Sequence, residues 1–390
     1  MKDIIITGPA PDSAPHGVRL SSVVMTHPRR QRAAEQLGTA LSVPRLVVDP
    51  EPHAAPNPLR TAKVAWGAVS PDATHHAVFQ DDISAGADLL DQLAAAAARH
   101  PQSAVALYAN WDTRNGELVR IAALTGISWV RGRWDEYVPT VALSMPADVA
   151  RALPGFTRAM DMKFDDEAAS LHLSRQRCRT YIPVPNPVEH IGDDSISGMN
   201  HHGIRKSACH VVDPDLPESL ALGAVLERVD FIPFLRFGES RVVLDHVVGT
   251  GDTPLCVEWR EALPHMGLAY WDLFDGFRAG GGFSARSDWE QVERTLGGDY
   301  ALELWIHCFL LGWQVQRVSQ HVDPAWVIGS AERLQRLASV AISTIGIGGL
   351  PRTRRAEVTP ALREALTTAA EHRVSMGRGF AARHRTRAQQ

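Results

Sequence analysis

Cysteine is scarce in this chain of 390 residues, and the four that occur do not form a recognisable pattern. They lie 31, 47 and 52 residues apart, at Cys178, Cys209, Cys256 and Cys308. The absence of any Cys-x-x-Cys pair excludes a zinc ribbon, and the wide spacing gives no support to a disulfide framework. No apolar run approaches the roughly 18 residues that a transmembrane helix needs, so a membrane span is not expected.

Positive charge is also limited, because the net charge is −4, which argues against a general nucleic-acid binder. The first fifteen residues contain one lysine, two aspartates and three prolines, unlike a secretory signal. We therefore expect a cytoplasmic protein. The hydrophobic share of 45% is ordinary for a globular chain with a large buried core, in one large domain or two smaller ones.

The C-terminal segment is the exception in charge. Residues 350–390 contain nine arginines and three glutamates, a net charge of +6, so the rest of the chain carries about −10. The simplest interpretation is a solvated or frayed basic tail. The alternative is a surface that docks an acidic partner or a phosphate-bearing substrate.

Strand and helix signals alternate through the first half of the chain. Short β-branched or apolar runs predict strands over 19–25, 45–48, 76–79, 104–108 and 137–143, with helices of 10 to 15 residues between several of them. Thr26 is expected to cap the helix that follows the first of these strands. This alternation is typical of βαβ units, and it predicts an α/β fold with a mixed, mostly parallel sheet flanked by helices.

The second half differs, with apolar helical patterns over 300–315 and 331–343 and glycine-rich stretches around them. We place a domain boundary near residue 205. The expected organisation is a catalytic or binding domain over 1–205, followed over 206–390 by a mainly helical domain with a basic C-terminal tail. The helical domain would shape an acceptor site or an oligomer interface.

Two carboxylates, Asp81 and Asp82, follow directly on the apolar strand in the fragment HAVFQDD, which begins at His76. In an open α/β sheet, ligands bind at the carboxyl ends of the strands. Two hard oxygen donors at such a point suit Mg²⁺ or Mn²⁺. An Asp-Asp pair also ends strands and caps helices, so the dipeptide alone has a purely structural alternative.

The order strand, helix, strand, proline-rich loop, basic helix, strand and Asp-Asp resembles the GT-A glycosyltransferases. In that family an acidic metal motif, usually written DxD, follows such a strand. Here the motif reads Gln80-Asp81-Asp82, so the first acid is missing. The resemblance covers roughly residues 19–200, and it implies a GT-A-like, Rossmann-like domain that binds a nucleotide-sugar.

The resemblance implies a donor site at the end of the first strand and along the basic helix. It assigns to base, ribose or diphosphate the residues Thr26, His27, Arg30, Asn57, Arg60 and Lys63. Arg60 and Lys63 are three residues apart on one helix face, as a diphosphate site would need. The alternative for each of these residues is a capped helix with a solvated basic face.

The resemblance also implies a site for Mn²⁺ or Mg²⁺. Asp82 is the preferred ligand, with Asp81 turned towards the ribose or a metal-bound water. GT-A enzymes often supply a late histidine to the metal, and His190 matches that position, with His201 and His202 as competitors. A lone histidine is also common as a purely structural residue.

A general base is implied for the inverting members of the class, at the head of a late helix. The fragment MDMKFDDEA offers Asp165 and Asp166 for this role, with Asp161 in reserve. Such a base must reach the acceptor hydroxyl, and desolvation raises its basicity. Loops after the metal motif would border the acceptor, through Trp111, Asn115 and residues 129–132.

We therefore expect a metal-dependent glycosyltransferase that moves a sugar from a nucleotide-diphosphate donor, with UDP-sugars as the first choice, to a hydroxyl of an unidentified acceptor. One alternative is a nucleotidyltransferase on a related sheet, which attacks at the α-phosphate but usually carries a glycine-rich basic signature that is missing here. Another is a non-catalytic scaffold that keeps the fold without the chemistry. Homo-oligomerisation stays open.

Overall fold

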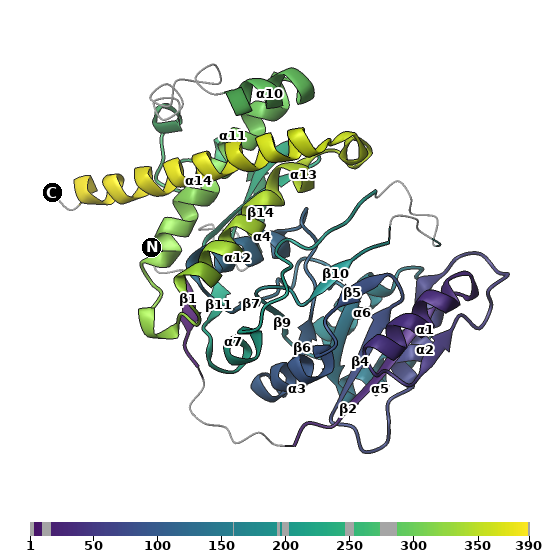
Figure 1. Ribbon diagram of the computed structural model, residues 1–390. Helices are drawn as coiled ribbons and strands as arrows, with labels where there is room; N and C mark the ends of the chain where they lie inside the picture. Colours follow the sequence, from purple (N-terminus) through teal and green to yellow (C-terminus); the bar gives the residue numbers. More distant parts are fainter. Residues whose placement is uncertain are drawn as a thin grey trace.

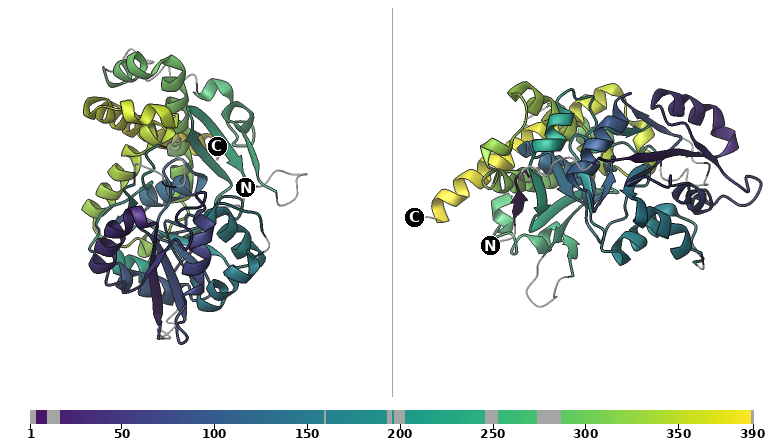
Figure 2. Two further views of the ribbon diagram at one scale, coloured as in Figure 1. Left: turned by 90° about the vertical axis from the view of Figure 1, so that its right-hand side faces the viewer. Right: turned by 90° about the horizontal axis from the view of Figure 1, so that it is seen from below.

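The structure is a computed structural model that describes residues 4–9, 17–158, 160–192, 196, 203–245, 253–273 and 287–388. An α/β layer fills the lower part of Figure 1, and the C-terminal helices α10 (Ser287–Leu296), α11 (Gly298–Ser319) and α14 (Pro360–Ala388) lie across its top. The two further views in Figure 2 show the same division, with the C-terminal helices to one side of the central sheet.

A mixed sheet of nine strands forms the centre of the α/β layer. In spatial order the strands are β3 (Leu46–Val48), β2 (Leu20–Thr26), β4 (His75–Gln80), β8 (Ala142–Pro146), β6 (Ala104–Ala106), β9 (Thr180–Pro183), β7 (Trp129–Arg131), β11 (Val225–Arg228) and β1 (Ile5–Thr7). Only β7, β8 and β11 run against the other six. The prediction of an α/β fold with a mixed, mostly parallel sheet is confirmed.

Helices flank this sheet, and those over 114–125 and 216–222 were not predicted. The flanking helices are α1 (Gln31–Ala40), α2 (Pro58–Gly67), α3 (Leu89–Arg99), α4 (Arg114–Thr125), α5 (Ala147–Phe156), α6 (Asp165–Arg175) and α7 (Leu216–Leu222). Local capping explains several boundaries. The Asn57 side chain accepts a hydrogen bond from the Arg60 amide at the start of α2, and α4 ends at Gly126 with φ of 75°.

Several local expectations are wrong. The loops expected at Asn115 and over 129–132 are a helix, α4, and a strand, β7, respectively. Thr26 caps no helix, because it is the last residue of β2, and His27 instead caps the short 3₁₀ turn Pro28–Arg30 that precedes α1. The strand expected over 137–143 begins only at Ala142. Pro139 lies in the missing part, and a proline has no N–H to donate to a neighbouring strand.

The chain beyond residue 205 contributes to both parts of the molecule. Strand β11 belongs to the central sheet, while β12 (Phe231–Arg236), β13 (Glu239–Leu244) and β14 (Leu255–Glu258) form a separate antiparallel sheet. The remaining elements are helical: α8 (Trp259–Ala262), η3 (Pro324–Trp326), α12 (Ala331–Ser343), α13 (Ile345–Gly349) and η4 (Arg352–Glu357). The helical C-terminal region is confirmed, the three-stranded sheet was not predicted, and the boundary near residue 205 stays a prediction.

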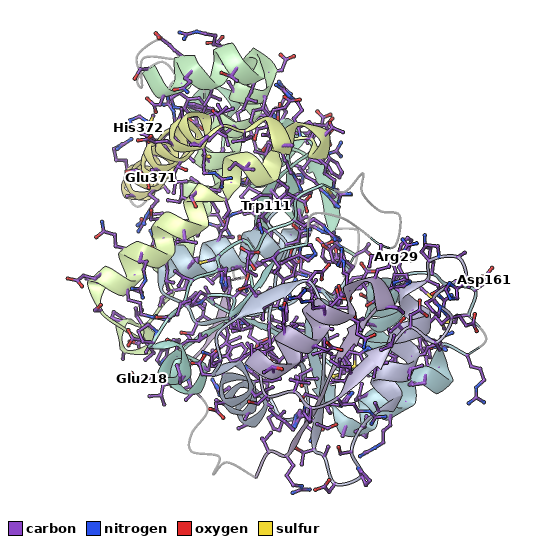
Figure 3. All side chains as sticks on the ribbon, turned by 45° about the vertical axis from the view of Figure 1, so that its right-hand side comes forward. Arg29, Trp111, Asp161, Glu218, Glu371 and His372 are labelled. Atoms are coloured by element: carbon purple, nitrogen blue, oxygen red, sulfur yellow. The ribbon has the colours of Figure 1, made fainter. Side chains whose placement is uncertain are left out.

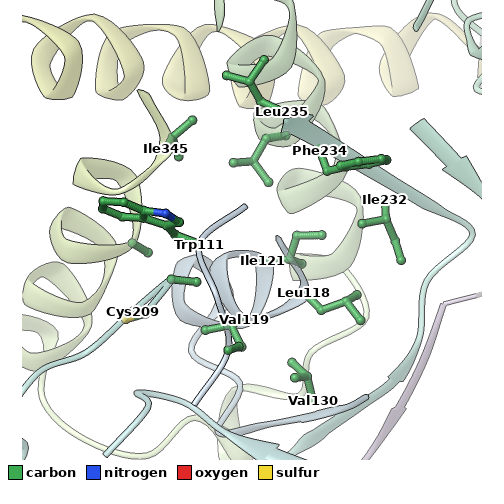
Figure 4. Packing of buried hydrophobic residues seen from close by; sticks show 14 of the residues in the cluster. Trp111, Leu118, Val119, Ile121, Val130, Cys209, Ile232, Phe234, Leu235 and Ile345 are labelled. Carbon is green, nitrogen blue, oxygen red and sulfur yellow. The ribbon is translucent and has the colours of Figure 1, made fainter. Parts of the chain in front are cut away.

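One hydrophobic core connects the sheet with the C-terminal helices. Leu118, Val119 and Ile121 of α4 pack between the central sheet and the second half of the chain, near Val130 of β7 and Ile232 of β12 (Figure 4). Each fully buried aliphatic side chain of this kind contributes about 1.5–3 kcal/mol. Helix α4 is therefore the element on which both halves of the molecule are assembled.

A buried ion pair reinforces this junction. Arg120 of α4 is 1% exposed, and its Nη1 lies 2.7 Å from Glu117 Oε1. The same guanidinium donates to the Thr344 hydroxyl and to the carbonyl oxygens of Trp111 and Ala341. Because Thr344 and Ala341 belong to the C-terminal half, this one side chain ties the two halves together.

We expect Arg120→Met to lower the free energy of unfolding by about 3–5 kcal/mol, because it leaves the carboxylate of Glu117 buried without its main partner. Chemical denaturation measures this loss. The control is Arg241→Gln, which breaks the exposed pair between Arg241 and Glu239 and should cost about 0–1 kcal/mol. Equal, small losses in both variants would contradict the assigned role of Arg120.

Candidate functional site

A cavity of about 390 Å³ opens at the carboxyl ends of β2 and β4. These parallel neighbours end at Thr26 and Gln80, so the side chains that follow both strands meet at one edge of the sheet. Of the residues that the sequence marks as candidates, nine line this cavity: Thr26, His27, Arg30, Asn57, Asp81, Asp82, Asp165, Asp166 and His190.

The two carboxylates after β4 both form ion pairs with the guanidinium of Arg30. Arg30 Nη1 lies 3.2 Å from Asp81 Oδ1 and 2.7 Å from Asp82 Oδ2, and the Thr26 hydroxyl donates to Asp81 Oδ2. Burial raises the pKa of Asp81, with a contribution from the charge of Asp82. Burial acts in the same direction on Asp82, but His190 and Arg30 outweigh it and lower the pKa of that carboxyl. Asp82 is therefore held as a carboxylate.

His190 reaches Asp82 through a short strand pairing. Strand β5 (Ile83–Ala85) pairs antiparallel with β10 (Val188–His190), and His190 stands opposite Ile83. Its Nε2 lies 3.5 Å from Asp82 Oδ2, although the two residues are 108 positions apart. Arg205 Nη2 lies 3.3 Å from the same Nε2. Histidine is a common metal ligand, and this nitrogen is the one that faces Asp82.

The donor set around Asp82 fits a divalent cation such as Mn²⁺ or Mg²⁺. Asp82 Oδ1 is buried and has no hydrogen-bond partner among the described residues. Within that part of the chain, no three or more His, Cys, Asp or Glu side chains form a metal cage. A hard cation does not need one, because Mg²⁺ is usually held by one or two protein groups together with substrate phosphates.

The acids of α6 line the same cavity, next to the end of β4. Asp165 is buried at the first turn, where its Oδ2 accepts from Gln80 Nε2 over 3.3 Å. Asp166 is half-buried, and burial together with the charge of Asp165 raises its pKa to about 6. Asp161 is exposed at the edge of the molecule, away from the cavity lining (Figure 3). Asp166 is thus the candidate base with both access and a raised pKa.

Arg60 and Lys63 do not line the cavity. Arg60 Nη2 lies 2.7 Å from Asp49 Oδ2, and the guanidinium also donates to the carbonyl oxygens of Glu51 and Ala55. These bonds hold the proline-rich loop that precedes α2, and that loop delivers Asn57 to the cavity wall. Arg60 therefore positions the loop, and Lys63 lies half-buried on the same helix.

The expected acceptor-side residues are core residues. Trp111, Asn115 and Trp129 are almost completely buried, and none of the three lines the cavity. Trp111 lies deep between the two halves of the chain (Figure 3), where Arg355 stacks on its ring. His201 and His202 lie outside the described residues.

Sequence reasoning missed six further lining residues: Tyr108, Asn110, Tyr137, Arg205, Arg236 and Arg352. The last two belong to β12 and η4, in the half of the chain in which no motif suggests a function. Arginine accounts for 36 of the 40 basic residues, so no single one stands out by composition. Only the packing of the second half against α4 brings them to this cavity.

No known family model matches the chain, and no curated protein matches its sequence. Within the described residues, no helix combines the length and apolar character needed to cross a membrane.

We expect carbon-detected NMR of aspartate carboxyls to show Asp166 titrating near pH 6, above its ordinary value of 3.8. Between those values the folded protein binds more protons at Asp166 than the unfolded chain, so the free energy of unfolding should fall as pH rises through this window. Asp166→Asn should remove the part of that slope that Asp166 contributes, and Asp165→Asn should lower the pKa of Asp166 because it removes a neighbouring negative charge. A titration near pH 4 in the wild type would contradict the raised pKa.

Proposed function

We propose that this protein is a metal-dependent glycosyltransferase that uses a nucleotide-diphosphate sugar as donor. The observation that carries the proposal is the meeting of Asp82 and His190 at the carboxyl end of β4, in a cavity that also contains Asp166. A carboxylate with an imidazole, and a separate carboxyl group with a raised pKa, are the two sets of groups that inverting glycosyl transfer to a hydroxyl uses.

In this proposal Asp82 and His190 hold the cation, which acts as a Lewis acid on the leaving diphosphate. The Thr26 hydroxyl fixes Asp81 through its hydrogen bond. Arg30 pairs with both carboxylates and lines the same cavity, so its positive charge would also favour a diphosphate held beside Asp82. His27 and Asn57, which line the cavity too, border the nucleoside.

Asp166 is assigned as the base that removes the proton from the acceptor hydroxyl. Its pKa of about 6 leaves it ionised at neutral pH and more basic than an ordinary aspartate. The charged or titratable groups that act on it are Asp165, Glu167 and Tyr137. Asp165 is assigned as a positioning residue, because its bond with Gln80 connects the start of α6 to the end of β4.

One observation favours the second candidate function, a scaffold without metal chemistry. The guanidinium of Arg30 already balances the charge of the acid pair, as a divalent cation would. A protein of this kind would bind a nucleotide through Arg30 without any dependence on metal. The two functions therefore differ in the response of nucleotide binding to EDTA.

Calorimetric titration with UDP, GDP and their sugars should show binding of one nucleotide with Mn²⁺ present and loss of that binding with EDTA. Asp82→Ala should also abolish the metal-dependent heat, because it removes the carboxylate ligand. Asp161→Ala is the matched control, since its carboxylate is exposed outside the cavity, and it should bind like the wild type. Nucleotide binding that is indifferent to both EDTA and Asp82→Ala would favour the scaffold, and binding of none would refute the donor site.

Release of the nucleoside diphosphate from the donor that binds best, with water or an added sugar as acceptor, measures the role of Asp166. We expect Asp166→Asn to lower kcat by about 10²–10⁴-fold with little change in donor affinity, since the base acts only in the chemical step. In the wild type the rate should rise with pH through about 6 as Asp166 loses its proton. A pH profile that Asp166→Asn leaves unchanged would assign the base elsewhere.

A further inference from the structure

The C-terminal half supplies two arginines to the cavity wall. Arg236 ends β12, and Arg352 begins η4. Both guanidinium groups lie against the ring of Phe237, with distances to its centroid of 4.8 Å for Arg236 and 5.0 Å for Arg352. Phe237 occupies the turn between β12 and β13, so this hairpin tip and η4 form one wall, which we call the arginine wall.

The two arginines of the arginine wall differ in their charge partners. Asp112 lies next to Arg352; it is fully buried, and its Oδ2 already lies 2.7 Å from Arg355 Nη2. Arg352 Nε is 3.6 Å from the same oxygen. Arg236 forms no ion pair with any residue that the structure describes, and its Nε is buried without a hydrogen-bond acceptor. A buried guanidinium edge with no counter-charge favours an anionic ligand.

The arginine wall and the proposed base line the same cavity. Tyr137 lines it as well, close enough to Asp166, Asp112 and Arg352 for their charges to interact with it. Two other arginines lie at the proposed metal site, because Arg30 contacts Asp82 and Arg205 contacts His190. Arg30 and Arg205 are therefore the arginines nearest the donor diphosphate, and the arginine wall is left for the second substrate.

We propose that the acceptor carries an anionic group, a phosphate or a carboxylate, and that Arg236 and Arg352 bind it. This inference rests on the proposed glycosyl transfer, because it divides the cavity between a donor side and an acceptor side. Arginine suits the task because its planar guanidinium donates two parallel hydrogen bonds to a phosphate or a carboxylate.

Inorganic phosphate and malonate are the probes, titrated into the full chain and followed by NMR, each with and without saturating UDP and Mn²⁺. The variants are Arg236→Gln, Arg236→Lys and the control Arg241→Gln. Arg241 lies on the neighbouring strand β13, outside the cavity, where it pairs with Glu239, so its substitution makes the same change of charge. Tighter binding of phosphate than of malonate would indicate a phosphorylated acceptor, and the reverse would indicate a carboxylated one.

We expect one probe to bind the wild type and the Arg241→Gln variant equally, with no displacement by UDP and Mn²⁺. Its affinity should fall by about tenfold or more in Arg236→Gln, since a charge-assisted hydrogen bond is lost, and should recover in part in Arg236→Lys. Failure of both probes to bind, or equal binding to wild type and Arg236→Gln, would overturn the anion site.

Two outcomes separate this inference from the proposed function. Displacement of the probe by UDP and Mn²⁺, with weaker UDP binding in Arg236→Gln, would assign Arg236 to the donor and overturn the acceptor assignment, while the glycosyltransferase proposal would stand. Arg236-dependent binding of a probe by a protein that binds no nucleotide would refute the glycosyltransferase proposal, and the acceptor assignment with it.

Discussion

The antiparallel pairing of β5 with β10 is the constraint on which the candidate site depends. Each strand has three residues, yet the register places His190 opposite Ile83, so its ring falls beside the carboxylate of Asp82. A register shift of one residue would turn His190 to the other face of the ribbon. The ladder of backbone hydrogen bonds thus brings together two side chains that are 108 positions apart.

Charge is distributed unevenly around the cavity, and this division gives it two sides. Acids gather at the end of β4 and the start of α6, where Arg30 is their main counter-charge, while the arginine wall approaches from the C-terminal half. Because the groups are half-buried, each uncompensated charge interacts more strongly than it would in water. The divalent cation of the proposed donor complex would balance the acids, and an acceptor with an anionic group would balance the arginine wall.

Much of the fold and about half of the site were predictable, because they depend on local patterns. Alternating apolar strands and amphipathic helices predict the α/β layer, and the acids after β4 and at the head of α6 stand next to recognisable elements. Arg60 shows the limit of such reasoning. Its place on α2 suggests that Arg60 binds a phosphate. The loop before the helix instead places Asp49 beside it, and the Asp49 carboxylate forms an ion pair with the Arg60 guanidinium.

The sequence by itself determined the α/β class, the edge of the sheet at which the cavity opens, and the acids that end β4 and begin α6. The tertiary structure decided that His190 lies beside Asp82 and that the Thr26 hydroxyl donates to Asp81 instead of capping a helix. It also decided that Arg236 and Arg352 line the cavity. The physical reason is distance along the chain. Strand and helix signals arise within a few residues, whereas these contacts require the pairing of β5 with β10 and the packing of the second half on α4, which no local pattern encodes.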